Sequence, residues 1–261
     1  MMVTSVPQFG NPALQSDTPT TVYESDDLQI LCYNPQAQNA VVVFDHRHPR
    51  DGNFAVIRPS NKIINAEFSY ITVASRRNDW FLSPSLIDCQ DQINSYVERY
   101  ARVVGFGSSM GGYGVLALSR AFRFKQVLIV SPQVTVFPDQ PPFDTRFADH
   151  AKNLDPTFET LAKSPRKGLG GVIVYDPNVA QDRAHADLIT TLFPRLKRVP
   201  MSFAGHPALR LVSQANSFHR IQDELISNHI SAFRLRQLHK LVRQTSPEYR
   251  RALNTYLETR T

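Results

Sequence analysis

One segment of the sequence, residues 101–120, constrains the fold of this chain more than any other. It begins with a short apolar run that suits a buried strand and ends with Val115-Leu-Ala-Leu118, which suits a helix. Five glycines fall within residues 105–114, between these two parts. The central Gly107-Ser-Ser-Met-Gly111 has the G-x-S-x-G spacing of a serine held on a tight strand-to-helix turn. The segment therefore predicts a strand, a sharp turn and a helix.

Ser109 is the serine that fits such a turn. The residues two before and two after it come close together there, and only minimal side chains fit. Ser108 fails this test because its flanks are Phe106 and Met110. A plain glycine-rich turn is one alternative. A dinucleotide-binding turn is another, but its third glycine would fall at Met110, and residues 99–138 contain no Asp or Glu to hold a ribose.

The composition is that of a globular protein. A chain of 261 residues is long enough for one large α/β domain, and 42% hydrophobic residues with a mean hydropathy of -0.29 fit a soluble protein. No apolar run approaches the roughly 18 residues that span a bilayer, and residues 1–7 lack the basic and apolar parts of a signal peptide. Cys32 and Cys89 have no C-x-x-C partner. We therefore expect a cytoplasmic protein without a disulfide framework.

Apolar runs and helical spacings alternate along most of the chain. The first two expected strands form a hairpin, and the others are short and buried. Together the strands span residues 20–25, 28–33, 40–44, 70–74, 103–104, 126–130, 171–175 and 196–203. Residues 84–100 have the spacing of one helix between two of them. The expected fold class is α/β, with a mainly parallel central sheet of about eight strands flanked by helices, and extra helices at the C-terminus.

With these elements in place, the chain resembles the α/β-hydrolases over roughly residues 20–210. In that family the nucleophile follows the fifth strand, the acid follows the seventh and a histidine follows the eighth. This sequence offers Ser109, Asp176 and His206 at those three points. The resemblance implies that Ser109 attacks an acyl carbonyl and that His206 removes its proton, with the acid orienting the histidine.

The position of the acid leaves a choice between two residues. The family places it a few residues past the seventh strand. Asp176 lies slightly early, at the strand end, and Asp182 slightly late, where it also suits the N-cap of the following helix. We favour Asp176 and keep Asp182 as the second candidate.

The resemblance also implies an oxyanion hole made of backbone N–H groups. One donor would be the residue after the nucleophile, Met110. The second would come from the loop after the third strand, where the usual His-Gly is replaced by Asp45-His46-Arg47. The N–H of His46 or of Arg47 is the candidate.

Charged and aromatic residues follow the third and fourth strands, at the edge of the sheet where open α/β folds bind ligands. The candidates for substrate binding are Arg47, Arg77, Trp80 and Tyr113. A solvated rim whose charges pair with one another is the alternative interpretation.

The net charge of +6 belongs mainly to the C-terminal tail. Residues 231–261 hold seven Lys or Arg and two Glu, and Ser246-Pro247 is typical of a helix start. We expect residues 1–19 to form a loose arm, 20–210 the main domain and 211–261 a helical extension packed on it. A protein partner or a second copy of the chain would dock on these helices. Nucleic acid is disfavoured, because aromatic residues are sparse among the tail charges.

The sequence as a whole predicts a serine hydrolase that cleaves an ester or related acyl bond, with a small-molecule or glycan-type substrate such as an acylated sugar. An acyltransferase on the same three residues is one alternative. A non-catalytic protein of this fold, which binds a partner through its basic helices, is another. No metal motif is present, and no cofactor is expected.

Overall fold

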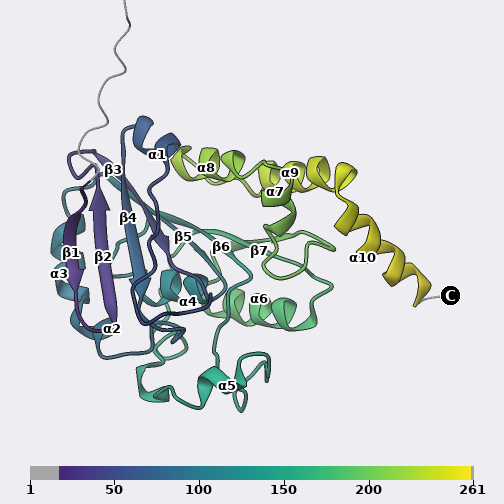
Figure 1. The fold of residues 1–261 in the computed structure, drawn as a ribbon, viewed down its shortest axis with the longest axis horizontal. Helices are drawn as coiled ribbons and strands as arrows, with labels where there is room; N and C mark the ends of the chain where they lie inside the picture. The colour runs from purple at the N-terminus through teal and green to yellow at the C-terminus, as the bar shows by residue number, and fades with distance from the viewer. Residues whose placement is uncertain (1–17, 260–261) are drawn as a thin grey trace, which may run out of the picture.

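The protein is described here from a computed structural model, which covers residues 18–259. Its centre is an eight-stranded sheet with the order β1-β2-β4-β3-β5-β6-β7-β8 (Figure 1). The strands are β1 (Thr20–Glu24), β2 (Leu28–Tyr33), β3 (Asn39–Phe44), β4 (Phe68–Ser75), β5 (Arg102–Ser108), β6 (Gln126–Val130), β7 (Gly171–Tyr175) and β8 (Leu196–Pro200).

The sheet is mainly parallel, as the alternation of strands and helices predicted. The hairpin strands β1 and β2 pair antiparallel with each other, β2 pairs antiparallel with β4, and every other pairing is parallel. The carboxyl ends of β3 to β8 therefore lie along one edge of the sheet. The predicted fold class is confirmed.

Each central strand is apolar on both faces because helices cover the sheet on both sides. Neighbouring residues of one strand enter different clusters. Val42 and Ile129 belong to one hydrophobic cluster, whereas Val41 and Leu128 belong to the other. Continuous apolar runs such as residues 40–44 follow directly from this arrangement.

Helices of different segments cover the two faces of the sheet (Figure 1). One face carries α2 (Ser85–Asp88), α3 (Gln90–Val97), α4 (Met110–Ala117) and α6 (Ala180–Leu192). The other carries α1 (Asn61–Asn65), α7 (Arg210–Gln214), α8 (His219–Ile226) and α9 (Ala232–Thr245). The connection from β6 to β7 contains the short α5 (Ala148–Ala151) and a 3₁₀ turn, Pro156–Phe158. In the described part of the chain, no helix is long and apolar enough to cross a membrane.

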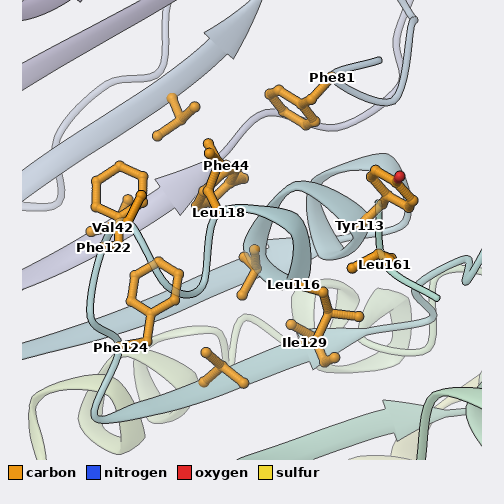
Figure 2. Close-up of a cluster of buried hydrophobic side chains, with 14 of the residues drawn as sticks. Val42, Phe44, Phe81, Tyr113, Leu116, Leu118, Phe122, Phe124, Ile129 and Leu161 are labelled. Carbon is orange, nitrogen blue, oxygen red and sulfur yellow. The ribbon is translucent and has the colours of Figure 1, made fainter. Parts of the chain in front are cut away.

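Aromatic and aliphatic side chains pack together in the core around α4 (Figure 2). Phe44 at the end of β3 meets Phe81 edge-on at 5.6 Å between ring centroids. Phe122 and Phe124, after α4, stack at 5.3 Å. These contacts fix α4 and the turn before it against the ends of β3 and β5, which is the framework that holds Ser109.

Some element boundaries differ from the sequence prediction. The helix expected over residues 84–100 is divided in two at Cys89. The last strand ends at Pro200, earlier than the predicted residue 203. Asp182 does not cap its helix: α6 begins at Ala180, and Asp182 lies inside its first turn. The short α1 was not expected from the sequence.

The two last helices are attached to different degrees. Helix α9 buries Leu235, Leu238 and Val242 in the same cluster as the central strands. Helix α10 (Pro247–Glu258) starts at the N-cap Ser246, as predicted, but buries no side chain and extends from one end of the molecule (Figure 1). It is held by edge-on contacts of Tyr249 and Tyr256 with Phe203. Docking of a partner on these helices stays a prediction. The expected arm, residues 1–19, lies almost wholly outside the described residues.

We expect α9 and α10 to differ in their contribution to stability. Leu235 is fully buried, and Leu257 is 51% exposed. Leu235→Ala should lower the free energy of unfolding by about 2–5 kcal/mol because it leaves a cavity. The matched Leu257→Ala should change it by no more than about 0.5 kcal/mol. Urea unfolding of both variants tests this, and equal losses would contradict the difference in packing.

Candidate active site

The turn at Ser109 is as tight as the glycine spacing suggested. Ser109 has φ +53° and ψ −119°, a backbone conformation that non-glycine residues rarely adopt. A Cβ atom on Gly107 would lie 2.3 Å from the carbonyl oxygen of Gly111. A Cβ atom on Gly111 would lie 2.4 Å from the carbonyl oxygen of Asp45. Only glycine fits at both places, and the turn therefore presents Ser109 at the carboxyl edge of the sheet.

Three side chains from separate segments form a hydrogen-bonded chain at this edge. Ser109 Oγ lies 3.1 Å from His206 Nε2, and His206 Nδ1 lies 2.8 Å from Asp182 Oδ2. A carboxylate can only accept, so Nδ1 carries the proton and Nε2 is free to accept the serine hydrogen. Asp182 is almost fully buried, and the side chain of His206 keeps 23% of its surface exposed. This is the arrangement in which a histidine acts as base toward a serine.

The preference for Asp176 as the acid is corrected by this geometry. Asp176 Oδ2 accepts the backbone N–H of Gly205, and Oδ1 accepts that of Asn178. Its carboxylate thus anchors the loop that carries His206, while Asp182 contacts the imidazole. The physical reason is that the first turn of α6 faces the imidazole of His206, whereas Asp176 at the end of β7 reaches the backbone of the same loop at Gly205.

The carboxylate of Asp182 is held in its charged form. Burial alone would raise its pKa, but the hydrogen bond and charge of His206, a hydrogen bond from Ser131 and the charge of Arg146 outweigh burial, so the pKa is lowered. Arg146 Nη1 donates to Asp182 Oδ1 at 2.8 Å. The position near a helix N-terminus also favours a negative charge.

Arg146 links the site to the connection between β6 and β7. Its guanidinium also binds both carboxylate oxygens of Asp144, which in turn accepts from His185 Nε2 at 3.1 Å. His185 Nδ1 accepts the N–H of Val134, so the buried imidazole is neutral with its proton on Nε2. Sequence reasoning missed Arg146 and Asp144, because nothing in an irregular, proline-rich connection reveals which distant carboxylate it meets.

Gln133 is a second residue that sequence reasoning missed. It is fully buried, and its Oε1 lies 3.3 Å from Ser109 Oγ and 3.0 Å from Trp80 Nε1. Its Nε2 donates to the carbonyl oxygen of Ser131. A polar residue three positions after the apolar run of β6 was the available signal, since the ends of neighbouring parallel strands meet at one edge.

The four predicted substrate-binding residues divide into two groups. Trp80 and Tyr113 present no surface to a substrate, because both are fully buried, so their expected role is corrected. Figure 2 shows Tyr113 in the core near Leu161. Arg77 pairs with Asp27 at the turn of the hairpin, at 2.5 Å. Of the four, Arg47 alone is both exposed and beside the site.

Arg47 contacts the ring of Phe147, which lies beside His206. Its guanidinium carbon lies 5.9 Å from the ring centroid of Phe147, and that ring lies 6.3 Å from the imidazole of His206. Phe147 also contacts Trp80 at 5.0 Å between centroids. Phe147, itself buried, therefore packs beside His206, with Arg47 and Arg146 next to it.

The proposed oxyanion donors differ in their surroundings. Met110 is the first residue of α4, where backbone N–H groups have no partner within the helix. The N–H of His46 donates to Asp45 Oδ1 at 2.8 Å. Arg50 binds the other carboxylate oxygen of Asp45 and so fixes this loop without the usual glycine. Partial desolvation, with the charges of His48 and Arg50, lowers the pKa of the exposed His46 against the opposing charge of Asp45.

A cleft opens beside the same loop. Its volume is about 420 Å³, within the range of small-molecule sites. It is bordered by the ends of β3 and β5 and by residues 55–57. The lining is Val43, Phe44, Asp45, His46, His48, Ala55, Val56, Ile57, Phe106 and Ser108.

Comparison with solved structures supports the fold. The capsule O-acetyltransferase of Neisseria meningitidis serogroup A is similar with a TM-score of 0.51, at 13% identity over 78% of this chain and 94% of that chain. A mutant of that enzyme in complex with CoA gives 0.51, at 14% identity over 82% and 98%. A putative hydrolase from Agrobacterium vitis S4 gives 0.52, at 13% identity over 80% and 98%. No family profile and no curated protein matches the sequence. The chain has the α/β-hydrolase fold.

Proposed function

We propose that this protein is a serine acyl hydrolase in which Ser109, His206 and Asp182 act together. The observation that carries the proposal is the hydrogen-bonded chain from Ser109 Oγ through His206 to Asp182, at 3.1 Å and 2.8 Å. The strained turn at Ser109 supports it, because such a backbone persists only where the surrounding structure holds it.

The reaction then runs in two halves. His206 Nε2 takes the hydroxyl proton as Ser109 Oγ attacks the acyl carbonyl, and the imidazolium passes that proton to the leaving oxygen as the ester bond breaks. In the second half His206 removes a proton from water, whose oxygen attacks the acyl-serine. The carboxylic acid leaves, and Ser109 recovers its proton. Asp182 keeps Nδ1 protonated and stabilises the imidazolium throughout.

The negative oxygen of each tetrahedral intermediate needs donors. We assign Met110 N–H as the first donor and Arg47 N–H as the second. The N–H of His46 is the weaker candidate because Asp45 already accepts it.

Acyl transfer to an alcohol is the second candidate. Two observations favour it: the cleft of about 420 Å³ beside the Asp45–His46 loop could hold an acceptor, and one protein of similar fold is a capsule O-acetyltransferase. The chemistry differs only in the second half, where an acceptor hydroxyl replaces water. The proposed substrate class is an acylated sugar or a comparable polar ester.

Turnover of p-nitrophenyl acetate, measured with and without added sugar acceptors, tests both candidates. Release of acetate in step with p-nitrophenol supports hydrolysis, and acetylated sugar in place of acetate supports transfer. Release of p-nitrophenol no faster than with heat-unfolded protein would reject both.

Replacing Arg47 tests its contribution to substrate choice. Arg47→Gln should raise KM for an anionic acyl ester about tenfold, since it removes a charge near the site, and should leave KM for a neutral ester nearly unchanged. Arg77→Gln is the matched control, because Arg77 pairs with Asp27. Equal effects of both variants, or equal effects on both esters, would show that Arg47 belongs to a solvated rim and does not bind substrate.

A further inference from the structure

A second cavity lies at the amino ends of β6, β7 and β8, at the edge of the sheet opposite Ser109. Its volume is about 480 Å³. Four separate segments border it: the end of the α4–β6 turn, the loop before β7, the start of β8 and the loop before α9. The lining is Arg123, Phe124, Lys125, Gln126, Arg166, Gly168, Gly170, Gly171, Arg195, Lys197, His229 and Ile230.

The charged side chains that line this cavity are all positive. Its lining contains five Lys or Arg side chains and no carboxylate. Arg123 pairs with Glu98. In the part of the chain that the structure describes, the other four form no ion pair, and Lys125, Arg195 and Lys197 are exposed. Acidic side chains usually lie among the cations of a protein surface. A cavity lined by cations without carboxylates therefore creates a strong positive potential.

Hydrogen bonds fix the side chains of Arg166 and His229 in the wall as donors. Arg166 Nη1 donates to the carbonyl oxygens of Ser119 and Phe124, which holds the guanidinium without neutralising it. Gln126 Oε1 accepts the N–H of Ile230, so its Nε2 donates to His229 Nδ1. His229 Nε2 then carries a proton and can donate.

The loop before β7 leaves room for a ligand. A Cβ atom on Gly168 or on Gly170 would meet nothing within 4 Å, so the backbone borders open space there. Phe124, the aromatic residue of the wall, is almost fully buried and offers no face for base stacking. A compact anion fits these features better than a nucleic-acid strand.

We propose that this cavity binds a small ligand with a chain of phosphate groups. Several cations around one concave space, with Arg166 held in place by its hydrogen bonds, suit the many charged oxygens of such a chain. The phosphate chain could belong to a nucleotide or to inorganic polyphosphate, and recognition of the chain itself is the shared chemistry. The site lies away from Ser109, so the proposal does not depend on the function of that residue.

Isothermal titration with tripolyphosphate tests the proposal. We expect saturable binding of one ligand per chain, and weaker binding as salt screens the charges. ATP separates the two sources: equal affinity means that the phosphate chain is the whole ligand, and tighter binding points to a nucleotide. Either result supports the proposal. Absence of saturable binding, or binding of orthophosphate as tight as that of tripolyphosphate, would overturn it.

Two charge-matched double variants separate the cavity from general electrostatic attraction. Lys125→Gln with Arg195→Gln removes two exposed cations of the cavity, and Kd should rise at least about tenfold. Arg58→Gln with Lys240→Gln removes two exposed cations elsewhere, and Kd should not change. Equal losses in both variants would overturn the proposal. So would tighter binding of a single-stranded oligonucleotide than of tripolyphosphate, which would make the cavity a nucleic-acid site.

Discussion

Ser109→Ala should lower kcat for p-nitrophenyl acetate by about 10⁴-fold or more, to the rate of the background reaction. The side chain that would form the acyl bond is lost, and alanine offers no other nucleophile. The variant should stay folded. Its free energy of unfolding should change by no more than about 1 kcal/mol, the value of the lost hydroxyl hydrogen bond.

The neighbouring Ser108→Ala serves as the comparison for this variant. Ser108 precedes the tight turn and has no hydrogen bond to His206 in the described structure, so its loss should leave measurable turnover. If Ser109→Ala kept wild-type turnover and Ser108→Ala did not, the nucleophile would be Ser108. The strained backbone at Ser109 would then have no role in positioning the nucleophile.

Asp182→Asn should lower kcat by about 10³- to 10⁴-fold, and Asp176→Asn by less than about tenfold. Asparagine at 182 can donate to His206 Nδ1, which favours the tautomer with the imidazole proton on Nε2. A protonated Nε2 can no longer accept the serine hydrogen. Asparagine at 176 keeps an oxygen for the N–H of Gly205 and disturbs only the loop. The reverse ranking of the two variants would make Asp176 the acid.

The effect of Asp182→Asn on the free energy of unfolding should depend on pH. The pKa of Asp182 is lowered in the folded state, so the charged carboxylate contributes stability above its unfolded pKa of about 3.9, and this contribution is lost as the pH falls through the lower folded pKa. The stability difference between wild type and Asp182→Asn should therefore be present at neutral pH and shrink in acid. A difference that grows below about pH 4 would contradict the lowered pKa.

Local patterns in the sequence were sufficient for the sheet and for the turn. Apolar runs predicted the central strands β3 to β7, because a buried parallel strand needs no polar residue along it, and alternation predicted the hairpin strands β1 and β2. Gly107 and Gly111 predicted the turn because the crowding that excludes other side chains there is local. The resemblance to the α/β-hydrolases supplied the order of nucleophile, acid and histidine along the strands, and His206 after the eighth strand followed from it.

The finer parts of the site depend on contacts between distant segments. Asp176 and Asp182 differ by less than two helical turns in sequence, and only the direction in which α6 starts decides which one meets His206. Arg146 and Gln133 reach the site from the connection after β6, whose path no periodicity predicts. Trp80 and Tyr113 lie near the site in the sequence pattern, but both side chains are fully buried and offer no surface.

Labelling with a fluorophosphonate, followed by peptide mass spectrometry, tests whether Ser109 is an activated nucleophile. Such a probe phosphonylates a serine that a neighbouring base activates. We expect a single phosphonyl adduct on Ser109 in the native protein, lost on unfolding before labelling, and strongly reduced in His206→Ala. Native protein that stays unlabelled, or carries the adduct on another serine, would contradict the assignment of Ser109 as an activated nucleophile.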